Sequence, residues 1–266
     1  MGLLSINNLR FRRGLGEQSF TVELPELEIE RGGMLAITGE SGSGKSTVLE
    51  LLGLVAKPMP GAHFGLTNGD VTPTDIADLW RRNSQRALAH IRARSIGFVL
   101  QSGGLLPYLS VRDNILINRR LLGMHLEDPT LDDIIKRLEI GALLRKKPAQ
   151  LSIGQQQRAA IGRALAHSPA LLLADEPTSA LDPRLADQVM DLLLDLVRRL
   201  GVTAVIATHE QARVRSLGLR EVYAYPRDPK DGFGSVFLSG DGNKAGNGEE
   251  TLEQQRSDNE GFGILP

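Results

Sequence analysis

Short apolar runs alternate along the chain with longer segments in which apolar residues recur every three or four positions. The first pattern predicts buried strands and the second predicts helices. Strands are predicted at 34–38, 95–100, 170–175 and 203–208, and a helix is predicted from residue 45, soon after the first strand. Strands that alternate with helices in this way indicate an α/β domain with a largely parallel sheet.

The two ends of the chain and its middle depart from this pattern. Residues 3–11 and 19–30 alternate apolar and polar side chains, which predicts antiparallel strands beside the parallel core. Between Gln101 and His167 helical periodicity replaces the strand-like runs, so we expect an inserted α-helical subdomain at about 102–167. From residue 240 Gly, Asn, Glu, Gln and Ser dominate, so we expect one domain at 1–239 and a disordered tail at 240–266.

Composition narrows the functional classes. The 266 residues are 41% hydrophobic, enough for one large domain or a domain with a subdomain. The 31 basic and 32 acidic residues are interspersed, so no basic face indicates a nucleic-acid partner. The absence of cysteine excludes disulfides and thiolate chemistry. No apolar run approaches the ~18 residues of a membrane span, and no signal sequence is visible, so work at a membrane would need another, spanning chain.

A glycine-rich segment between the predicted strand at 34–38 and the next helix carries the first chemical signal. The sequence GESGSGKST fits the P-loop pattern in its expected strand–helix context. Gly42 and Gly44 let the backbone N–H groups face an anion, and the helix N-terminus points its dipole at the same phosphates. Lys45 is expected at the β- and γ-phosphates and Ser46 at Mg²⁺. The residues expected around the nucleotide are Gly39, Glu40, Ser41, Gly42, Ser43, Gly44, Lys45, Ser46 and Thr47.

Polar residues end two other predicted strands. Asp175 and Glu176 follow LLLA, and beside a P-loop they are expected to bind Mg²⁺ and to act as general base, respectively. His209 also ends a strand, and parallel strands present their carboxyl ends at the ligand edge of the sheet. We therefore expect His209 near the γ-phosphate. The other histidines are interpreted as structural; they are His63, His90, His125 and His167.

The segment LSIGQQQRAAIGRALAH, from Leu151, begins a helix whose N-terminus is unusual. Ser152 and Gln155 complete a capping box. Gly154 stands in the first turn, where glycine costs about 1 kcal/mol relative to alanine. Three consecutive glutamines occupy positions where charged residues would be ordinary. A glycine and three uncharged polar residues at a helix N-terminus indicate a function beyond helix formation.

Taken in order, these motifs resemble those of the ATP-binding cassette (ABC) ATPases, to about residue 225. The resemblance implies a RecA-like P-loop NTPase core that uses ATP and Mg²⁺. GESGSGKST then corresponds to Walker A, LSIGQQQR to the signature, LLLADE to Walker B with catalytic Glu176, and SALD to the D-loop. Gln101 corresponds to the Q-loop glutamine, with catalytic and metal roles, and His209 to the switch histidine.

The resemblance also implies that two subunits close head to tail around two ATP molecules. Ser152, Gly154 and Gln155 would then meet the γ-phosphate held by the partner, and Asp182 of the D-loop would border the nucleotide. Every motif is present in this one chain, which favours a homodimer. Membrane-spanning permease subunits are the expected partners, at the cytoplasmic face of the membrane.

Two positions depart from the family pattern. Ile153 replaces the first glycine of the signature. The aromatic residue that commonly stacks on adenine, near the end of the first strand, is replaced by Arg13, whose planar guanidinium can also stack. Phe11 is the competing candidate, although strand alternation turns it toward the core.

The leading hypothesis is the ATP-hydrolysing subunit of a membrane transporter. Leu105, Leu106, Tyr108 and Leu109 look exposed and would contact the membrane partner, or alternatively form a local core. One alternative is an ABC ATPase that drives a non-transport complex of the cell-division or envelope type. Another is a soluble ABC protein acting on ribosomes or DNA, a class that usually has two cassettes or a long coiled coil. The segment around Gln101 is most similar to the lipoprotein-release, macrolide-efflux and cell-division group, and the transported substrate is not encoded in these motifs.

Overall fold

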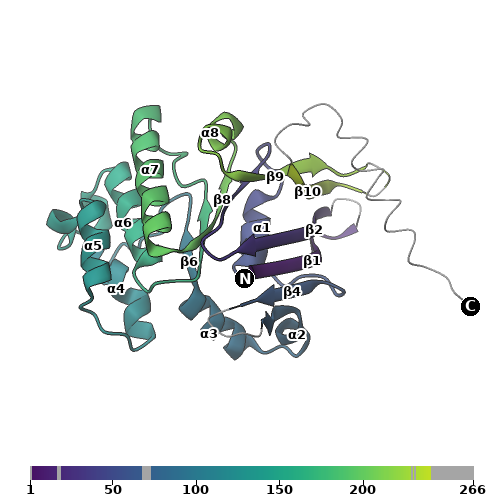
Figure 1. Cartoon of the computed structure of the whole chain (residues 1–266), viewed down its shortest axis with the longest axis horizontal. Coiled ribbons are helices and arrows are strands. Elements are labelled where there is room, and N and C mark those ends of the chain that lie inside the picture. Colours follow the sequence, from purple (N-terminus) through teal and green to yellow (C-terminus); the bar gives the residue numbers. More distant parts are fainter. Residues whose placement is uncertain (1, 17–18, 68–72, 229, 231, 241–266) are drawn as a thin grey trace, which may run out of the picture.

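A computed structural model describes residues 2–16, 19–67, 73–228, 230 and 232–240. They form one mixed ten-stranded sheet in the order β5-β4-β1-β2-β10-β9-β3-β8-β7-β6, with helices packed on it (Figure 1). The strands are β1 Gly2–Arg13, β2 Phe20–Glu30, β3 Met34–Thr38, β4 His63–Leu66, β5 Thr74–Asp75, β6 Ile96–Val99, β7 Leu171–Asp175, β8 Thr203–Thr208, β9 Arg220–Pro226 and β10 Gly234–Gly240.

The helices follow the strands in the α/β order that the sequence predicts. They are α1 Lys45–Leu52, α2 Ile76–Arg81, α3 Gln85–Ser95, α4 Val111–Leu121, α5 Pro129–Arg137, α6 Ile153–Leu165, α7 Pro183–Leu200 and α8 Gln211–Ser216, with 3-10 turns η2 Gly141–Leu143 and η3 Pro148–Gln150. Among the described residues, no helix is both long and apolar enough to span a membrane.

The sheet has a parallel half and a largely antiparallel half. Strands β9, β3, β8, β7 and β6 run parallel to one another, whereas β1 pairs antiparallel with β2 and with β4. Strand β10 joins the halves, because it pairs antiparallel with β9 and parallel with β2. The predicted fold class, a parallel core with an N-terminal antiparallel region, is confirmed.

Successive side chains of the central strands point to opposite faces of the sheet and pack into two separate hydrophobic cores. Leu171 and Leu173 of β7 pack with α1 and the antiparallel strands, while Leu172 and Ala174 pack with α4, α6 and α7. The same alternation divides the side chains of β8 between the cores. Central parallel strands are apolar on both faces because both faces are covered.

The central strands match their predicted ranges to within one residue at each end, but β4, β5, β9 and β10 were not predicted. Strands β4 and β5 are short, with four and two residues, whereas β9 and β10 have seven residues each, so length does not explain why those two were missed. Strand β2, which was predicted, contains Pro25, which disfavours an interior strand. The ladder between β2 and β10 covers only Thr21–Glu23, so Pro25 lies beyond it. Gly240 belongs to β10, so the predicted tail boundary is wrong at that residue; the remaining tail, 241–266, lies outside the described residues.

Helices α4, α5 and α6 occupy the stretch where the sequence predicts a helical subdomain. A buried arginine links them: Arg119 of α4 is only 2% exposed. Its guanidinium donates to the backbone oxygens of His125 (2.7 Å) and Ala166 (2.7 Å) and pairs with Asp128 (2.9 Å), the N-cap of α5. One side chain therefore ties the end of α6 to the α4–α5 connection. The assignment of 102–167 as a subdomain stays a prediction.

We predict that Arg119→Met lowers the free energy of unfolding by about 3 kcal/mol. The variant leaves two backbone oxygens and the carboxylate of Asp128 without their donor. Urea denaturation followed by circular dichroism measures the change. The control is Arg120→Met, which removes a solvent-exposed pair with Asp113 and should cost less than about 1 kcal/mol. Equal losses in the two variants would contradict the role given to Arg119.

Candidate functional site

The carboxyl ends of four adjacent parallel strands bring the predicted chemistry together. Strand β3 leads into the glycine-rich loop 39–44, β8 is followed by His209, β7 ends at Asp175, and Gln101 lies two residues after β6. These strands are neighbours in the order β3-β8-β7-β6 and run in one direction. Residues far apart in the sequence therefore meet at one edge.

The glycine-rich loop adopts a conformation that side chains would obstruct. Gly44 is the N-cap of α1 with φ 93°, and a Cβ there would lie 2.8 Å from Val22 Cγ2. A Cβ on Gly39 would lie 2.7 Å from Ala224 Cβ. No side chain caps α1, so the N–H groups of its first turn are available to an anion at this edge.

Lys45, the first residue of α1, is buried under the loop. Its Nζ donates to the backbone oxygens of Gly39 (2.9 Å) and Glu40 (2.8 Å) and lies 3.9 Å from Glu176 Oε1. Burial lowers the pKa of Lys45, while the charges of Glu176 and Asp175 oppose that change. The ammonium group thus lies in a pocket of carbonyl and carboxylate oxygens.

Asp175 and Ser46 present oxygen atoms beside this ammonium group. The Ser46 hydroxyl donates a hydrogen bond to the Asp175 carboxylate, whose pKa is nevertheless raised, chiefly by burial. Asp175 Oδ1 is among the buried side-chain atoms that lack a hydrogen-bond partner in the described part of the chain. A buried carboxylate oxygen without a donor suits a cation, and hydroxyl and carboxylate oxygens are the ligands that Mg²⁺ prefers. Within the described ranges no cluster of three His, Cys, Asp or Glu residues could hold a metal by itself, so nucleotide phosphates or water would complete the set.

Glu176 connects Lys45 to His209. Its Oε2 lies 2.7 Å from His209 Nδ1, while its Oε1 faces the Lys45 ammonium. The backbone of Glu176 is left-handed, with φ 46°, an unusual conformation for a residue with a long side chain. Its N–H donates to the Ala207 oxygen on β8, and its carbonyl oxygen accepts bonds from the N–H and hydroxyl of Ser179. These bonds hold the turn that aims the carboxylate at the sheet edge.

The signature segment lies elsewhere in the molecule. Helix α6 packs against α4, α5, α7 and β6, and Figure 1 shows it apart from α1. The predicted capping box is present: Ser152 Oγ accepts from the Gln155 N–H, and Gln155 Oε1 accepts from the Ser152 N–H. Ser152 and Ile153 are exposed at this helix end. The structure therefore does not bring Ser152, Gly154 and Gln155 to the P-loop of their own chain.

Gly154 has a packing reason that the sequence does not reveal. A Cβ at this position would lie 2.6 Å from Leu185 Cδ2, on the first turn of α7. Asp182, the predicted D-loop residue, caps that helix by accepting a bond from the Leu185 N–H (3.1 Å). The close approach of α6 to α7 thus explains the glycine within the single chain.

The remaining glutamines of the signature, Gln156 and Gln157, make contacts within the chain. Gln156 Nε2 donates to the backbone oxygens of Pro148 and Leu151, which fixes η3 against α6. Gln157 is buried, and its Oε1 would lie 3.5 Å from a Cβ on Gly103. Uncharged amides suit these sites because a charge would be poorly solvated there.

A second link from α6 to the segment after Gln101 was not predicted. The Arg163 guanidinium donates to the backbone oxygens of Gly103 and Gly104, which both have positive φ. Burial lowers the pKa of Arg163. The paired glycines were the available signal, because glycine readily adopts the left-handed conformation that tight turns require. Arg163 therefore joins the signature helix to the loop that carries Gln101.

The segment that looked exposed in the sequence is mostly half-buried. Leu105 packs on the second core, and Leu106 and Leu109 are also half-buried, whereas Tyr108 is 68% exposed. The buried amide of Asn114 explains this difference, because it bonds to backbone atoms of Leu106, Leu109 and Ser110 and draws the segment onto α4. The expectation of exposure was wrong for the three leucines.

The two candidates for the adenine contact lie on one face of β1. Arg13 pairs across the ladder with Phe20, and its guanidinium contacts Glu50 of α1 at 2.8 Å. Phe11 is partly buried against the first core, as alternation predicts. Phe20 was overlooked: its ring would lie 3.2 Å from a Cβ on Gly44, so an aromatic side chain does border the loop.

Three comparisons place this geometry among known proteins. The family described as ABC transporter matches residues 23–179. The lipoprotein-releasing system ATP-binding protein LolD of Legionella pneumophila (strain Lens) is 40% identical over 210 residues, covering 76% of this chain and 88% of LolD. The uncharacterized ABC transporter ATP-binding protein Rv0986 of Mycobacterium tuberculosis is 41% identical over 184 residues, 68% of this chain and 70% of Rv0986.

Solved structures agree with this assignment. The dimeric structure of MJ0796, a bacterial ABC transporter cassette, matches with a TM-score of 0.69 at 33% identity, over 83% of this chain and 93% of that one. Its post-hydrolysis dimer bound to ADP and Pi matches with a TM-score of 0.68 at 32% identity and the same coverage. The chain belongs to the ABC transporter family, whose ATP-binding cassette it carries.

Proposed function

We propose that this protein binds ATP with Mg²⁺ and hydrolyses it as a homodimer that drives membrane-spanning permease subunits. The observation that carries the proposal is the group of Lys45, Asp175, Glu176 and His209 at one sheet edge, with Glu176 between Lys45 and His209. This edge combines a phosphate-binding helix terminus with a carboxylate able to accept a proton.

Lys45 supplies the charge for the β- and γ-phosphates. Its ammonium group now bonds to the carbonyl oxygens of Gly39 and Glu40. Phosphate oxygens are charged acceptors, so they form the stronger hydrogen bonds with the same group. The other loop residues, 39–44, Ser46 and Thr47, provide the surrounding N–H and hydroxyl donors. Arg13 lies on the same face of β1 as α1, where its planar guanidinium can stack on the base.

Mg²⁺ would be held by Ser46 and Asp175, with Gln101 added from the neighbouring strand end. When bound, it supplies positive charge that offsets the charge of the phosphates. Asp175 Oδ1, buried and without a donor among the described residues, supports this assignment.

Glu176 is the general base. A carboxylate held beside the phosphate site accepts a proton from the attacking water as the bond to phosphorus forms. His209 fixes the orientation of this carboxylate through the bond to Oε2, and its exposed ring lies where it can also reach the γ-phosphate. Gln101 is exposed at the same edge and completes the polar lining.

The signature acts on the ATP held by a second subunit. Ser152 and the N-terminus of α6 are directed to solvent in the single chain, and α6 lies apart from its own α1 (Figure 1). Head-to-tail closure brings Ser152, Gly154, Gln155 and Asp182 to the nucleotide of the partner. The dimeric structures of MJ0796 support the dimer on which this arrangement depends.

Tyr108 marks the surface for the membrane partner. The Asn114 bonds hold its loop, and Arg163 joins the same loop to α6. When the dimer closes at the signature, α6 therefore moves the loop at Gly103 and Gly104. This loop passes the movement on to the membrane-spanning subunit at the cytoplasmic face of the membrane. The similarity to LolD, an ATP-binding protein of a lipoprotein-releasing system, favours a role in a releasing system over the cell-division alternative.

We predict that Lys45→Ala weakens ATP binding by at least about tenfold, because the fixed cation at the phosphates is lost. Isothermal titration calorimetry measures the affinity. Lys57→Ala, at an exposed lysine, is the matched control and should bind ATP as the native protein does. An affinity for Lys45→Ala within about threefold of native, roughly 0.65 kcal/mol, would remove Lys45 from the site.

We predict that Glu176→Gln lowers the rate of ATP hydrolysis by at least about 100-fold while ATP still binds. The amide keeps the shape and the bond to His209 but cannot accept the proton. Phosphate release measures the rate, and size-exclusion chromatography with ATP should show a lasting dimer. Glu26→Gln, at an exposed position of β2, should hydrolyse normally. Native turnover by Glu176→Gln would show that another group is the base.

A mixture of two inactive variants tests whether the signature acts between subunits. Lys45→Ala holds ATP only weakly, and Ser152→Arg places a large side chain where the γ-phosphate must dock. In a heterodimer, one site combines the native P-loop of the Ser152→Arg chain with the native signature of the Lys45→Ala chain. We predict that mixing restores hydrolysis at this site, measured by phosphate release.

Differently tagged chains establish that heterodimers have formed, and each variant alone is the control. Confirmed heterodimers without hydrolysis or ATP-dependent closure would mean that the signature does not serve the partner's ATP. An obligatory second, different ATPase chain in the purified complex would contradict the homodimer.

A further inference from the structure

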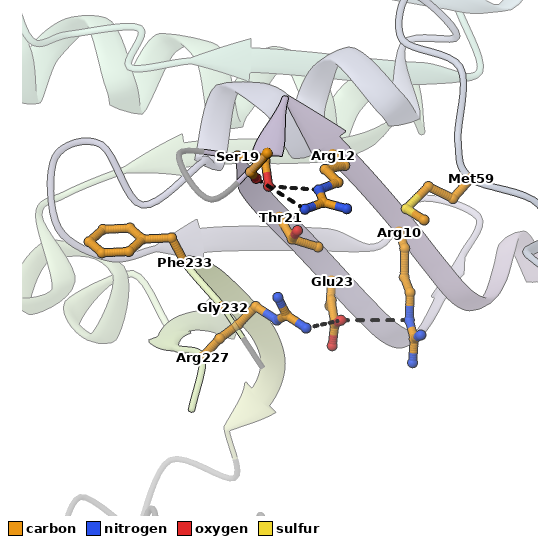
Figure 2. Close-up of a pocket in the computed structure, with 10 residues that line it drawn as sticks. Arg10, Arg12, Ser19, Thr21, Glu23, Met59, Arg227, Gly232 and Phe233 are labelled. Carbon is orange, nitrogen blue, oxygen red and sulfur yellow. Dashed lines mark hydrogen bonds and ion pairs between the residues drawn. The ribbon is translucent and has the colours of Figure 1, made fainter. Parts of the chain in front are cut away.

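A polar cavity lies on the face of β1 and β2 that is turned away from α1. Strand alternation places Leu9 and Phe11 toward the core and Arg10 and Arg12 on the opposite face. Their ladder partners are Glu23 and Thr21. A cavity of about 270 Å³ opens there, lined by Arg10, Arg12, Gly16, Ser19, Thr21, Glu23, Met59, Arg227, Gly232 and Phe233 (Figure 2).

Backbone hydrogen bonds fix the walls of this cavity. Met59 N–H donates to the Arg10 oxygen (2.8 Å), Thr21 N–H to the Phe233 oxygen (2.9 Å), and Arg227 N–H to the Gly234 oxygen (3.0 Å). A Cβ on Gly234 would lie 2.0 Å from the Thr21 oxygen, so only glycine permits this approach. The cavity is therefore built by chain segments that are tied to one another.

Charge is concentrated in this cavity. The described residues that line it include three arginines and one glutamate, although the whole chain has a net charge of −1. Glu23 Oε1 lies 3.0 Å from Arg227 Nη2 and 3.7 Å from Arg10 Nε, and Figure 2 shows these guanidiniums on either side of it. The side chains of Glu23 and Arg227 are only 16% and 14% exposed, whereas that of Arg10 is 52% exposed and so remains accessible to a ligand.

Arg12 adds a guanidinium that hydroxyl and carbonyl groups hold in place. Its Nε donates to Ser19 Oγ (2.7 Å) and its Nη2 to the Gly16 oxygen (3.3 Å), both uncharged acceptors. A guanidinium has five N–H donors, and carboxylates or phosphates are the partners that match its planar fork. The positive charge of Arg12 is thus oriented but not neutralised by these two bonds.

We propose that this cavity binds a phosphate monoester group. Its second ionisation has a pKa of about 6, so the group carries nearly two negative charges at neutral pH, and its oxygens are acceptors that suit the guanidinium groups of Arg10 and Arg12. The volume suits a small head group rather than a folded partner. Met59 and Phe233, both exposed, border the cavity with apolar surface for the part of the molecule that carries the phosphate.

This inference does not depend on the ATPase proposal. Arg12 and Arg13 are adjacent in β1, so they point to opposite faces of the strand, and only Arg13 contacts α1. A ligand in the cavity would therefore lie behind the sheet from the P-loop.

The test uses the full-length chain with excess ADP and Mg²⁺, so that the P-loop does not compete for the probe. Phenyl phosphate is the soluble probe, titrated by calorimetry. Vesicles of phosphatidylcholine with phosphatidic acid, compared with phosphatidylcholine alone, present the same group on a lipid. Binding of phenyl phosphate indicates a soluble source, and binding only to phosphatidic acid vesicles indicates a lipid head group.

Two variants change the charge of the cavity in opposite directions. Arg10→Gln should weaken binding of the responding probe about tenfold, and Glu23→Gln should tighten it about threefold, because a repelling carboxylate is lost. An increase in affinity cannot result from misfolding. Arg86→Gln, at an exposed arginine of α3 outside the cavity, is the matched control and should bind as native. The Lys45→Ala background should give the same result if binding is independent of the P-loop.

Three results would overturn the proposal. One is the absence of binding to both probes, and another is binding that Arg10→Gln and Glu23→Gln leave unchanged. The third is binding only of an acidic peptide with the sequence of residues 248–260, which would assign the cavity to carboxylates of a protein segment instead.

Discussion

The ammonium group of Lys45 is the charge on which the arrangement of the sheet edge depends. It is buried, and burial alone would favour the neutral form, so the surrounding oxygen atoms must offset the cost of removing it from water. Two carbonyl oxygens of the loop bond to it, and the Glu176 carboxylate lies within 3.9 Å. The same carboxylate orients His209. One buried cation thereby sets the positions of the loop, the turn after β7 and the residue after β8.

Alternation of side chains along β1 places its arginines on two opposite faces of the strand. Arg13 points toward α1 and contacts Glu50, while Arg10 and Arg12 point into the cavity on the opposite face. Each face has its own acidic residue. Glu50 pairs with Arg13 on the face toward α1, and Glu23 pairs with Arg10 and Arg227 on the opposite face. A change of one position in the register of β1 would exchange these faces, so the core contacts of Leu9 and Phe11 also determine where the arginines lie.

Helix α6 has contacts at both ends that reach beyond its own segment. Near its start, Gly154 allows the approach of Leu185 on α7, and farther along Arg163 holds the carbonyl oxygens of Gly103 and Gly104. Gln157 is buried beside the same turn. These contacts hold α6 and the segment after Gln101 together, because the guanidinium of Arg163 bonds to two successive carbonyl oxygens.

The sequence by itself determined the elements whose signals are local. Apolar runs predicted the central strands, Ser152 and Gln155 predicted the start of α6, and the spacing of glycines with Lys45 predicted the phosphate loop. Each of these depends on neighbours within a few residues, where side-chain type and backbone preference act directly.

Only the tertiary structure decided the features that depend on distant partners. Strand β10 lies between β9 and β2 and pairs with both, a placement that its own sequence does not specify. Leu105, Leu106 and Leu109 are half-buried because the Asn114 amide draws their segment onto α4. Gly154 meets Leu185, Arg163 reaches Gly103, and Arg227 approaches Glu23 only after the chain has folded. The glycines of these contacts were visible in the sequence as unusual residues, but their partners were not, because a distant partner alone is an ordinary surface or core residue.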